Sequence, residues 1–280
     1  MDNLIPMGQT IAYLLEAFVL LYIAKLVYSK IFRKVDLKAE LYARNNYALA
    51  VAVSGYFLGI CLALGGALVG QSQGWQADLI DIGLYGLLAI VLMLIAGFLC
   101  EKILLHSFSN TKEIIEDQNL GTAFVEAGIH IANGLIVLAI VQGEGPLVSG
   151  IAFWLLAQVV FIVAGRLYEM ITPHSIHDEL ERDNAAVGLA FAGLLVGMGN
   201  IISIAVAGDY SGWQVGLQVF AMDVGFGFVA LYGIHKLTDV ILAPGVSLGS
   251  EQVKQQPNVG AGLIEAIGYL GGSTLIVWIF

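Results

Sequence analysis

The chain contains eight apolar stretches, each long enough to cross a lipid bilayer as an α-helix. A hydrocarbon core of about 30 Å requires about 20 residues at about 1.5 Å per residue. A β-barrel is excluded, because its strands would have about 10 residues of alternating polarity, whereas these stretches are apolar on every face. The sequence therefore predicts an all-α fold, a polytopic transmembrane helical bundle. The predicted spans are residues 5–32, 47–70, 79–105, 120–141, 147–171, 185–207, 215–242 and 259–280.

The composition excludes several classes of function. Only 12% of the residues are charged and the mean hydropathy is +0.84, whereas soluble domains carry about 25% charged residues. The formal charge of −10 provides no basic face for nucleic acid. Cys61 and Cys100 lie in apolar stretches, so they suggest neither a disulfide framework nor a metal site. No catalytic or phosphate-binding motif is present, and we expect no enzyme activity, no cofactor and no bound metal.

The charge distribution predicts the orientation in the membrane. The connectors after the first, third, fifth and seventh spans are long and polar, and all 12 basic residues lie in or beside them. The positive-inside rule then places these connectors in the cytoplasm and both termini outside. The first span follows no basic residues and lacks a cleavage site, so we expect it to remain as a helix. We expect a multi-pass protein of the inner (plasma) membrane.

The chain also repeats itself. A shift of 138 residues pairs Arg44 with Arg182 and Gly55 with Gly193, and a shift of 139 pairs Glu126 with Glu265. This indicates a tandem duplication, with one four-span repeat over residues 1–142 and another over residues 143–280. Units with an even number of spans keep the same orientation, so the two repeats are predicted to be parallel about an axis along the membrane normal. The centre of such a bundle is a natural place for a site.

One segment of each repeat carries a family resemblance. The sequences RNNYALAVAVSGYFLG from Arg44 and DNAAVGLAFAG from Asp183 resemble the signature of the domain-of-unknown-function 350 family, whose smallest, YjfL-like members resemble one four-span half. Glu126 and Glu265 interrupt the pattern in the second and fourth hairpins. The resemblance implies a polytopic inner-membrane protein of bacterial type, and it brings no activity and no catalytic residues.

Four acidic residues, Glu16, Glu126, Asp223 and Glu265, lie within the predicted hydrocarbon region. Each ionised acid there costs about 2.5–3.5 kcal/mol unless it is protonated, paired or hydrated. We find no Lys or Arg at matching depth, so these acids are predicted to bind a small cation or a proton. The alternative is a protonated side chain that hydrogen-bonds a neighbouring helix.

Glu126 and Glu265 form the strongest candidate pair, because the duplication places them at equivalent depths where they would face each other. His130 and Asn133 follow Glu126 at i+4 and i+7, so they extend one polar stripe in which His130 would relay protons. Asp223, whose counterpart is Tyr85, would supply a second site.

Small and amide residues also recur at equivalent positions. Gly55, Gly59, Gly193 and Gly197 are predicted to let helices pack closely, or else to line a pore or form a hinge. Four asparagines that precede even-numbered spans are predicted to cap helices, or else to ring a cytoplasmic mouth. They are Asn46, Asn119, Asn184 and Asn258.

The sequence thus favours a channel or transporter for a small cation or a proton, which uses its intramembrane carboxylates. The alternative is a non-transporting membrane scaffold or envelope-stress component that acts through protein partners. The expected partners are the lipid bilayer, a small cation or proton, and either further copies of the chain or another membrane protein.

Overall fold

The computed structural model describes residues 4–69, 72, 74–143, 145–208 and 210–279, and these residues form helices without any strand. Two short π-helical segments and three short α-helices lie between the long helices. In chain order the elements are α1 (Leu4–Val27), η1 (Tyr28–Phe32), η2 (Ala39–Ala43), α2 (Tyr47–Leu68), α3 (Trp75–Ile103), α4 (Asn110–Ile115), α5 (Leu120–Gln142), α6 (Leu147–Ile171), α7 (Ile176–Glu181), α8 (Ala185–Val206), α9 (Trp213–Ile241), α10 (Leu248–Gln252) and α11 (Val259–Ile279).

Among the described residues, eight helices are long and apolar enough to cross a membrane. This confirms the all-α polytopic bundle with eight spans in two tandem four-helix repeats. Two spans begin earlier than predicted, α3 at Trp75 and α9 at Trp213. Gly74 and Gly212 have positive φ angles of 115° and 99°, which only glycine adopts readily. Each glycine turns the chain sharply, so the helix begins at the next residue and includes a polar first turn.

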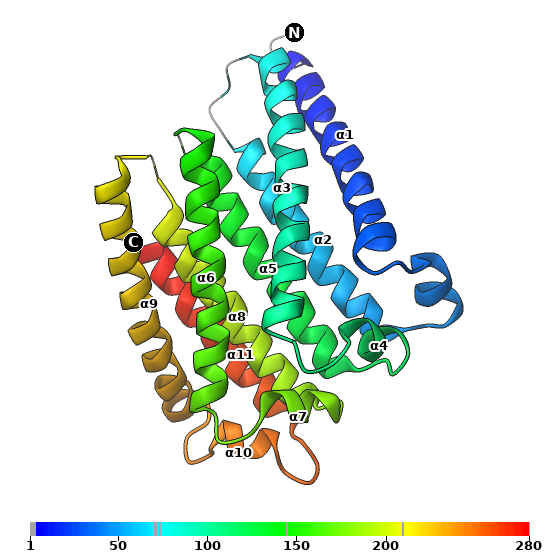
Figure 1. Cartoon of the computed structure of the whole chain (residues 1–280), viewed down its shortest axis with the longest axis vertical. Helices are drawn as coiled ribbons and strands as arrows, with labels where there is room; N and C mark the ends of the chain where they lie inside the picture. The colour runs from blue at the N-terminus through cyan, green and yellow to red at the C-terminus, as the bar shows by residue number, and fades with distance from the viewer. Residues whose placement is uncertain (1–3, 70–71, 73, 144, 209, 280) are drawn as a thin grey trace.

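The long helices form two layers (Figure 1). The even-numbered spans α2, α5, α8 and α11 pack side by side in one row, and α1, α3, α6 and α9 cover one side of it. The hairpins are therefore added along a line. The prediction of a shared central site was wrong, because α8 separates α5 from α11 and no helix of the row closes it into a ring.

Glycines set the close spacing within the row. A side chain at Gly55 would overlap the backbone of Ala127, and one at Gly193 would overlap Ala266. Gly59 lies equally close to the carbonyl of His130, whereas Gly197 meets Tyr269 at an ordinary close contact. In a bilayer, such small-residue contacts supply the van der Waals packing that holds helices together.

The short elements η2, α4, α7 and α10 lie at one end of the bundle, which we call the connector end (Figure 1). Four asparagines cap the even-numbered spans there: Oδ1 of each accepts a backbone N–H from Leu49, Thr122, Val187 or Ala261. Three of the Nδ2 groups also donate to a carbonyl of the next connector helix. Asn46 donates to Ile114, Asn119 to Leu180 and Asn184 to Gln252.

Candidate functional site

Glu126 lies on α5, about 9 Å from the first residue of the helix, and it is only 3% exposed. Its partner is Arg33, whose Nε donates to Oε1 at 3.3 Å and whose Nη2 pairs with Oε2. The guanidinium is fully buried. The expectation that Glu126 has no basic partner was therefore wrong. Because η1 widens the last turn of α1, the Arg33 N–H bonds to the Tyr28 carbonyl, and both side chains turn towards Glu126.

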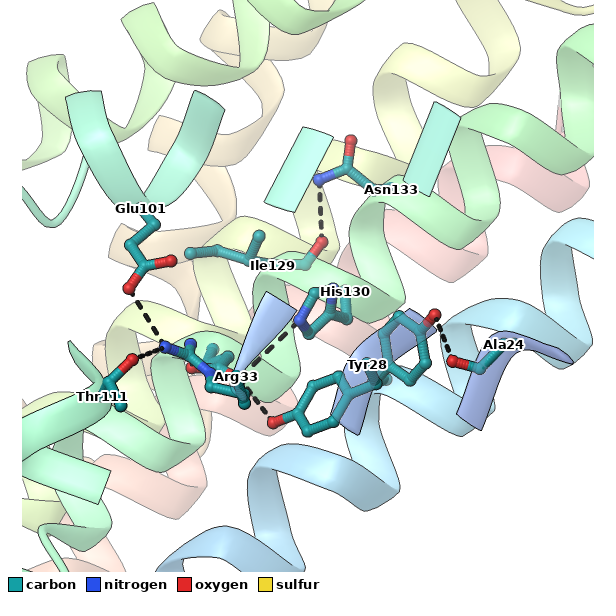
Figure 2. A network of polar contacts seen from close by, with 10 residues as sticks. Ala24, Tyr28, Arg33, Glu101, Thr111, Ile129, His130 and Asn133 are labelled. Carbon is teal, nitrogen blue, oxygen red and sulfur yellow. Dashed lines mark hydrogen bonds and ion pairs between the residues drawn. The ribbon is translucent and has the colours of Figure 1, made fainter. Parts of the chain in front are cut away.

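Arg33 joins four elements at this point (Figure 2). Its Nη1 donates to Glu101 of α3 at 3.0 Å and to Thr111 of α4 at 2.9 Å. The Tyr28 hydroxyl donates to Glu126 at 2.9 Å. The Glu101 side chain is 22% exposed, so the network begins near the surface of the connector end and leads to a buried carboxylate.

His130 lies one turn beyond Glu126 and is 2% exposed. Its Nε2 is 3.8 Å from Glu126 Oε1, which is too long for a hydrogen bond. Neither ring nitrogen has a hydrogen-bond partner among the described residues. The rings of Tyr28, Phe32 and Tyr56 surround the imidazole. A buried polar atom without a partner costs about 1–3 kcal/mol, so the two nitrogens favour an occupant such as water.

The polar stripe continues from Asn133 to the second repeat. Asn133 donates to the Ile129 carbonyl at 2.9 Å (Figure 2) and accepts from Gln158 of α6 at 2.9 Å. Gln158 Oε1 and Trp154 Nε1 are buried without a partner among the described residues. The polar atoms of α6 thus point onward, away from the connector end.

A cavity of about 320 Å³ lies at the opposite end of the bundle. Ser149 and Phe153 of α6 line it together with Leu92 of α3 and Ile140 of α5. Phe153 directly precedes Trp154, so the cavity lies next to the last of the unpaired polar atoms.

Glu265 on α11 occupies a separate cluster and is 2% exposed. The Tyr168 hydroxyl donates to its Oε1 at 3.3 Å, His235 Nδ1 lies 3.1 Å from the same oxygen, and Gln252 donates to Oε2. Tyr168 is 140 residues after Tyr28, so a tyrosine–glutamate pair occurs in both repeats. The two glutamates share no partner, and the expectation that they face each other was wrong.

Glu16 and Asp223 join neither cluster. Glu16, on α1, is partly exposed and lies against Gly83 of α3, and its Oε2 has no partner among the described residues. Asp223 is partly exposed on α9. In the connector before α8, His177 contacts Glu169 and the Leu104 carbonyl, which places it in an interhelical contact.

Sequence reasoning missed several residues of the two clusters. Tyr28 and Tyr168 were detectable only at a shift one residue longer than the one that aligns the glutamates. Arg33 and Gln252 lie outside the predicted spans, and Gln158 and His235 have no polar counterpart in the other repeat.

Comparison with known proteins places the chain in a family. The model of the family described as Domain of Unknown Function (DUF350) matches residues 1–141 and again residues 144–280. A UPF0719 transmembrane protein of Aquifex aeolicus (strain VF5) is 19% identical over 248 residues, which cover 86% of this chain and 89% of that protein. The UPF0719 transmembrane protein YshE of Bacillus subtilis (strain 168) is 24% identical over 137 residues, which cover 49% of this chain and 100% of that protein. No solved structure matches the chain. The chain belongs to the DUF350 family, and it carries two tandem copies of the family domain.

Proposed function

We propose that the chain moves protons across its membrane along the buried polar residues of the first repeat. The observation that carries this proposal is the position of His130, one turn from Glu126 and one turn from Asn133, with both ring nitrogens unpaired. Histidine gains and loses a proton near neutral pH, and ionisable residues within membrane spans mark proton relays.

The contacts of Glu126 favour a proton over a metal cation. Donors from Tyr28 and Arg33 already occupy both carboxylate oxygens. The nearest amide oxygen, Asn133 Oδ1, is taken by Gln158. A metal cation such as Na⁺, K⁺ or Mg²⁺ would need several free oxygen ligands at one point, whereas a proton needs only a lone pair.

The proposed route has three parts. Glu101, on the side predicted to be cytoplasmic, exchanges protons with the solution. Arg33 holds Glu126 in place, and His130 accepts a proton at one ring nitrogen and releases one from the other. Water molecules at the unpaired atoms of Gln158 and Trp154 then complete the route to the cavity at the opposite end, because a water needs polar partners in order to occupy a buried position.

The competing explanation is a scaffold in which the Arg33–Glu126 pair only fastens the end of α1 to α5. In that case the interior conducts nothing, and replacing His130 by an aromatic ring without nitrogen has no effect on any flux.

The test is proton flux into liposomes that contain the purified protein, with a pH-sensitive dye inside and a potassium diffusion potential as the driving force. We expect flux above that of protein-free liposomes, and its loss in His130→Phe, which keeps a ring in the aromatic surroundings. The matched control is His106→Phe at the exposed connector end, which keeps the wild-type rate. Absence of flux in a folded, monodisperse wild-type sample would overturn the proposal and favour the scaffold.

A further inference from the structure

The second repeat contains a histidine–carboxylate pair that the proposed route does not use. His235 on α9 places Nδ1 3.1 Å from Oε1 of Glu265 on α11. The His235 side chain is 26% exposed, whereas that of Glu265 is 2% exposed. A deeply buried acid is thus joined to an imidazole that is partly open to the surroundings.

The equivalent position in the first repeat has a different charge. There the glutamate is paired with Arg33, which stays protonated at any pH that the protein meets. Residues 171–173, which correspond to Arg33, are Ile, Thr and Pro, and among the described residues no Lys or Arg forms an ion pair with Glu265. The only cation that can form beside Glu265 in this arrangement is a protonated His235.

The helix of His235 contributes two further charged groups. Asp239 lies one turn nearer the connector end, and its Oδ1 is buried without a partner among the described residues. Lys236 is exposed, and its ammonium lies 5.6 Å from the Tyr232 ring centroid. An acid with an unpaired oxygen therefore adds to the negative charge around the imidazole, and the ammonium is directed to the surface of α9.

The neighbouring elements contribute one acid, one histidine and two tyrosines. The Tyr269 ring stacks on His235 at 6.2 Å between centroids, and Tyr168 bonds to Glu265. In the connector before α7, burial lowers the pKa of the His174 imidazole, against the opposing charges of Glu179 and Glu265. His174 therefore stays neutral near pH 7, and His235 is the group here that takes up a proton.

We propose that His235 and Glu265 form a reversible proton-binding site, separate from the Glu126–His130 route. An ionised carboxylate only accepts hydrogen bonds, so His235 Nδ1 carries a hydrogen that it donates to Glu265. The proton from water binds at Nε2, and the imidazolium formed there balances the charge of Glu265. The Gln252 amide that bonds to Glu265 belongs to α10, and its carbonyl accepts from Asn184, so the charge of this site acts on the connector between α9 and α11.

The test uses the full-length protein in lipid nanodiscs with ¹⁵N-labelled histidine, so that the ring nitrogens report their own protonation. His235→Gln assigns the signal. In the wild type we expect His235 to carry two N–H groups at about pH 5.5 and one at about pH 8. In Glu265→Gln we expect one N–H group at both values, because the balancing charge is gone. Glu126→Gln and His130→Phe leave the response of His235 unchanged.

A His235 ring that keeps one state in the wild type, or that responds equally in Glu265→Gln, would overturn the proposal. If Glu265→Gln does not fold, Asp239→Asn serves instead: the doubly protonated fraction near pH 6.5 falls if the site exists, and an unchanged fraction contradicts it. The measurement needs no flux, so its failure and the failure of the proposed transport are separate results.

Discussion

Arg33 and Glu126 lie 93 residues apart in the sequence and form a buried ion pair between the end of α1 and the middle layer of the bundle. Two further bonds from the same guanidinium reach α3 and α4. One side chain therefore connects the first two hairpins at the depth of the candidate site.

Replacement of Arg33 alone should destabilise the protein strongly. Arg33→Met leaves an uncompensated charge on Glu126, and we expect a loss of about 3–5 kcal/mol in the free energy of unfolding, as for other broken buried pairs. The double variant Arg33→Met with Glu126→Leu recovers much of this loss, because it leaves no buried charge. Reversible unfolding of the purified protein in mixed micelles measures both.

The control for Arg33 is Arg44→Met, since Arg44 pairs with Glu40 and its side chain is 65% exposed. We expect a change of about 1 kcal/mol or less, as for surface pairs. An Arg33→Met variant no less stable than Arg44→Met would show that the buried pair contributes little to folding.

Glycine substitutions should separate close helix contacts from helix propensity. Gly55→Ala places a methyl group into the backbone of Ala127, so we expect little folded protein in the membrane. Gly225→Ala on α9 meets nothing within 4 Å, and we expect unchanged or improved stability, because alanine favours a helix by about 1 kcal/mol relative to glycine. Fluorescence-detected size-exclusion chromatography of both variants decides the matter, and equal yields would contradict the close packing of α2 and α5.

The asparagines allow a comparison between a helix cap and a cap that also links two hairpins. Asn119 and Asn258 both cap a helix, but Asn119 also donates to the Leu180 carbonyl and to Glu113. Asn258→Ala should cost about 1 kcal/mol, the usual value of a cap. Asn119→Ala should cost about 1–3 kcal/mol more, because it leaves a buried carbonyl unpaired. Equal losses in thermal unfolding would mean that the link to α7 adds no stability.

The sequence predicts the helices well for reasons that lie in single residues. Hydropathy defines the spans, and Asn46, Asn119 and Asn184 mark where helices start because their side chains satisfy free N–H groups. The arrangement of the helices in a row is harder to predict. Gly55 and Gly193 indicate that helices pack closely, but a small residue does not specify which helix approaches it.

The candidate site was only half predicted. The stripe of Glu126, His130 and Asn133 follows from helical spacing along one element. Arg33 was missed because depth was judged from residue counts along a regular helix, whereas the π-helical turn of η1 returns the side chain to the interior. Gln158 and His235 come from other helices, and their contacts depend on packing that no local pattern records.

The step between His130 and the opposite cavity can be tested with Gln158. Gln158→Leu removes the partner of Asn133 and an unpaired polar atom on the proposed route. We expect proton flux to fall about tenfold or more, which corresponds to a barrier increase of about 1.4 kcal/mol, the scale of one hydrogen bond. Asn200→Leu is the matched control, since Asn200 is also an amide within a span and bonds to Ser273 in the second repeat at 2.9 Å. Liposome flux should be unchanged in Asn200→Leu, and equal losses in both variants would point to a general effect of intramembrane amides on folding. Full flux in Gln158→Leu would place the route elsewhere, because water at the remaining atoms of α6 would lack the amide that orients it.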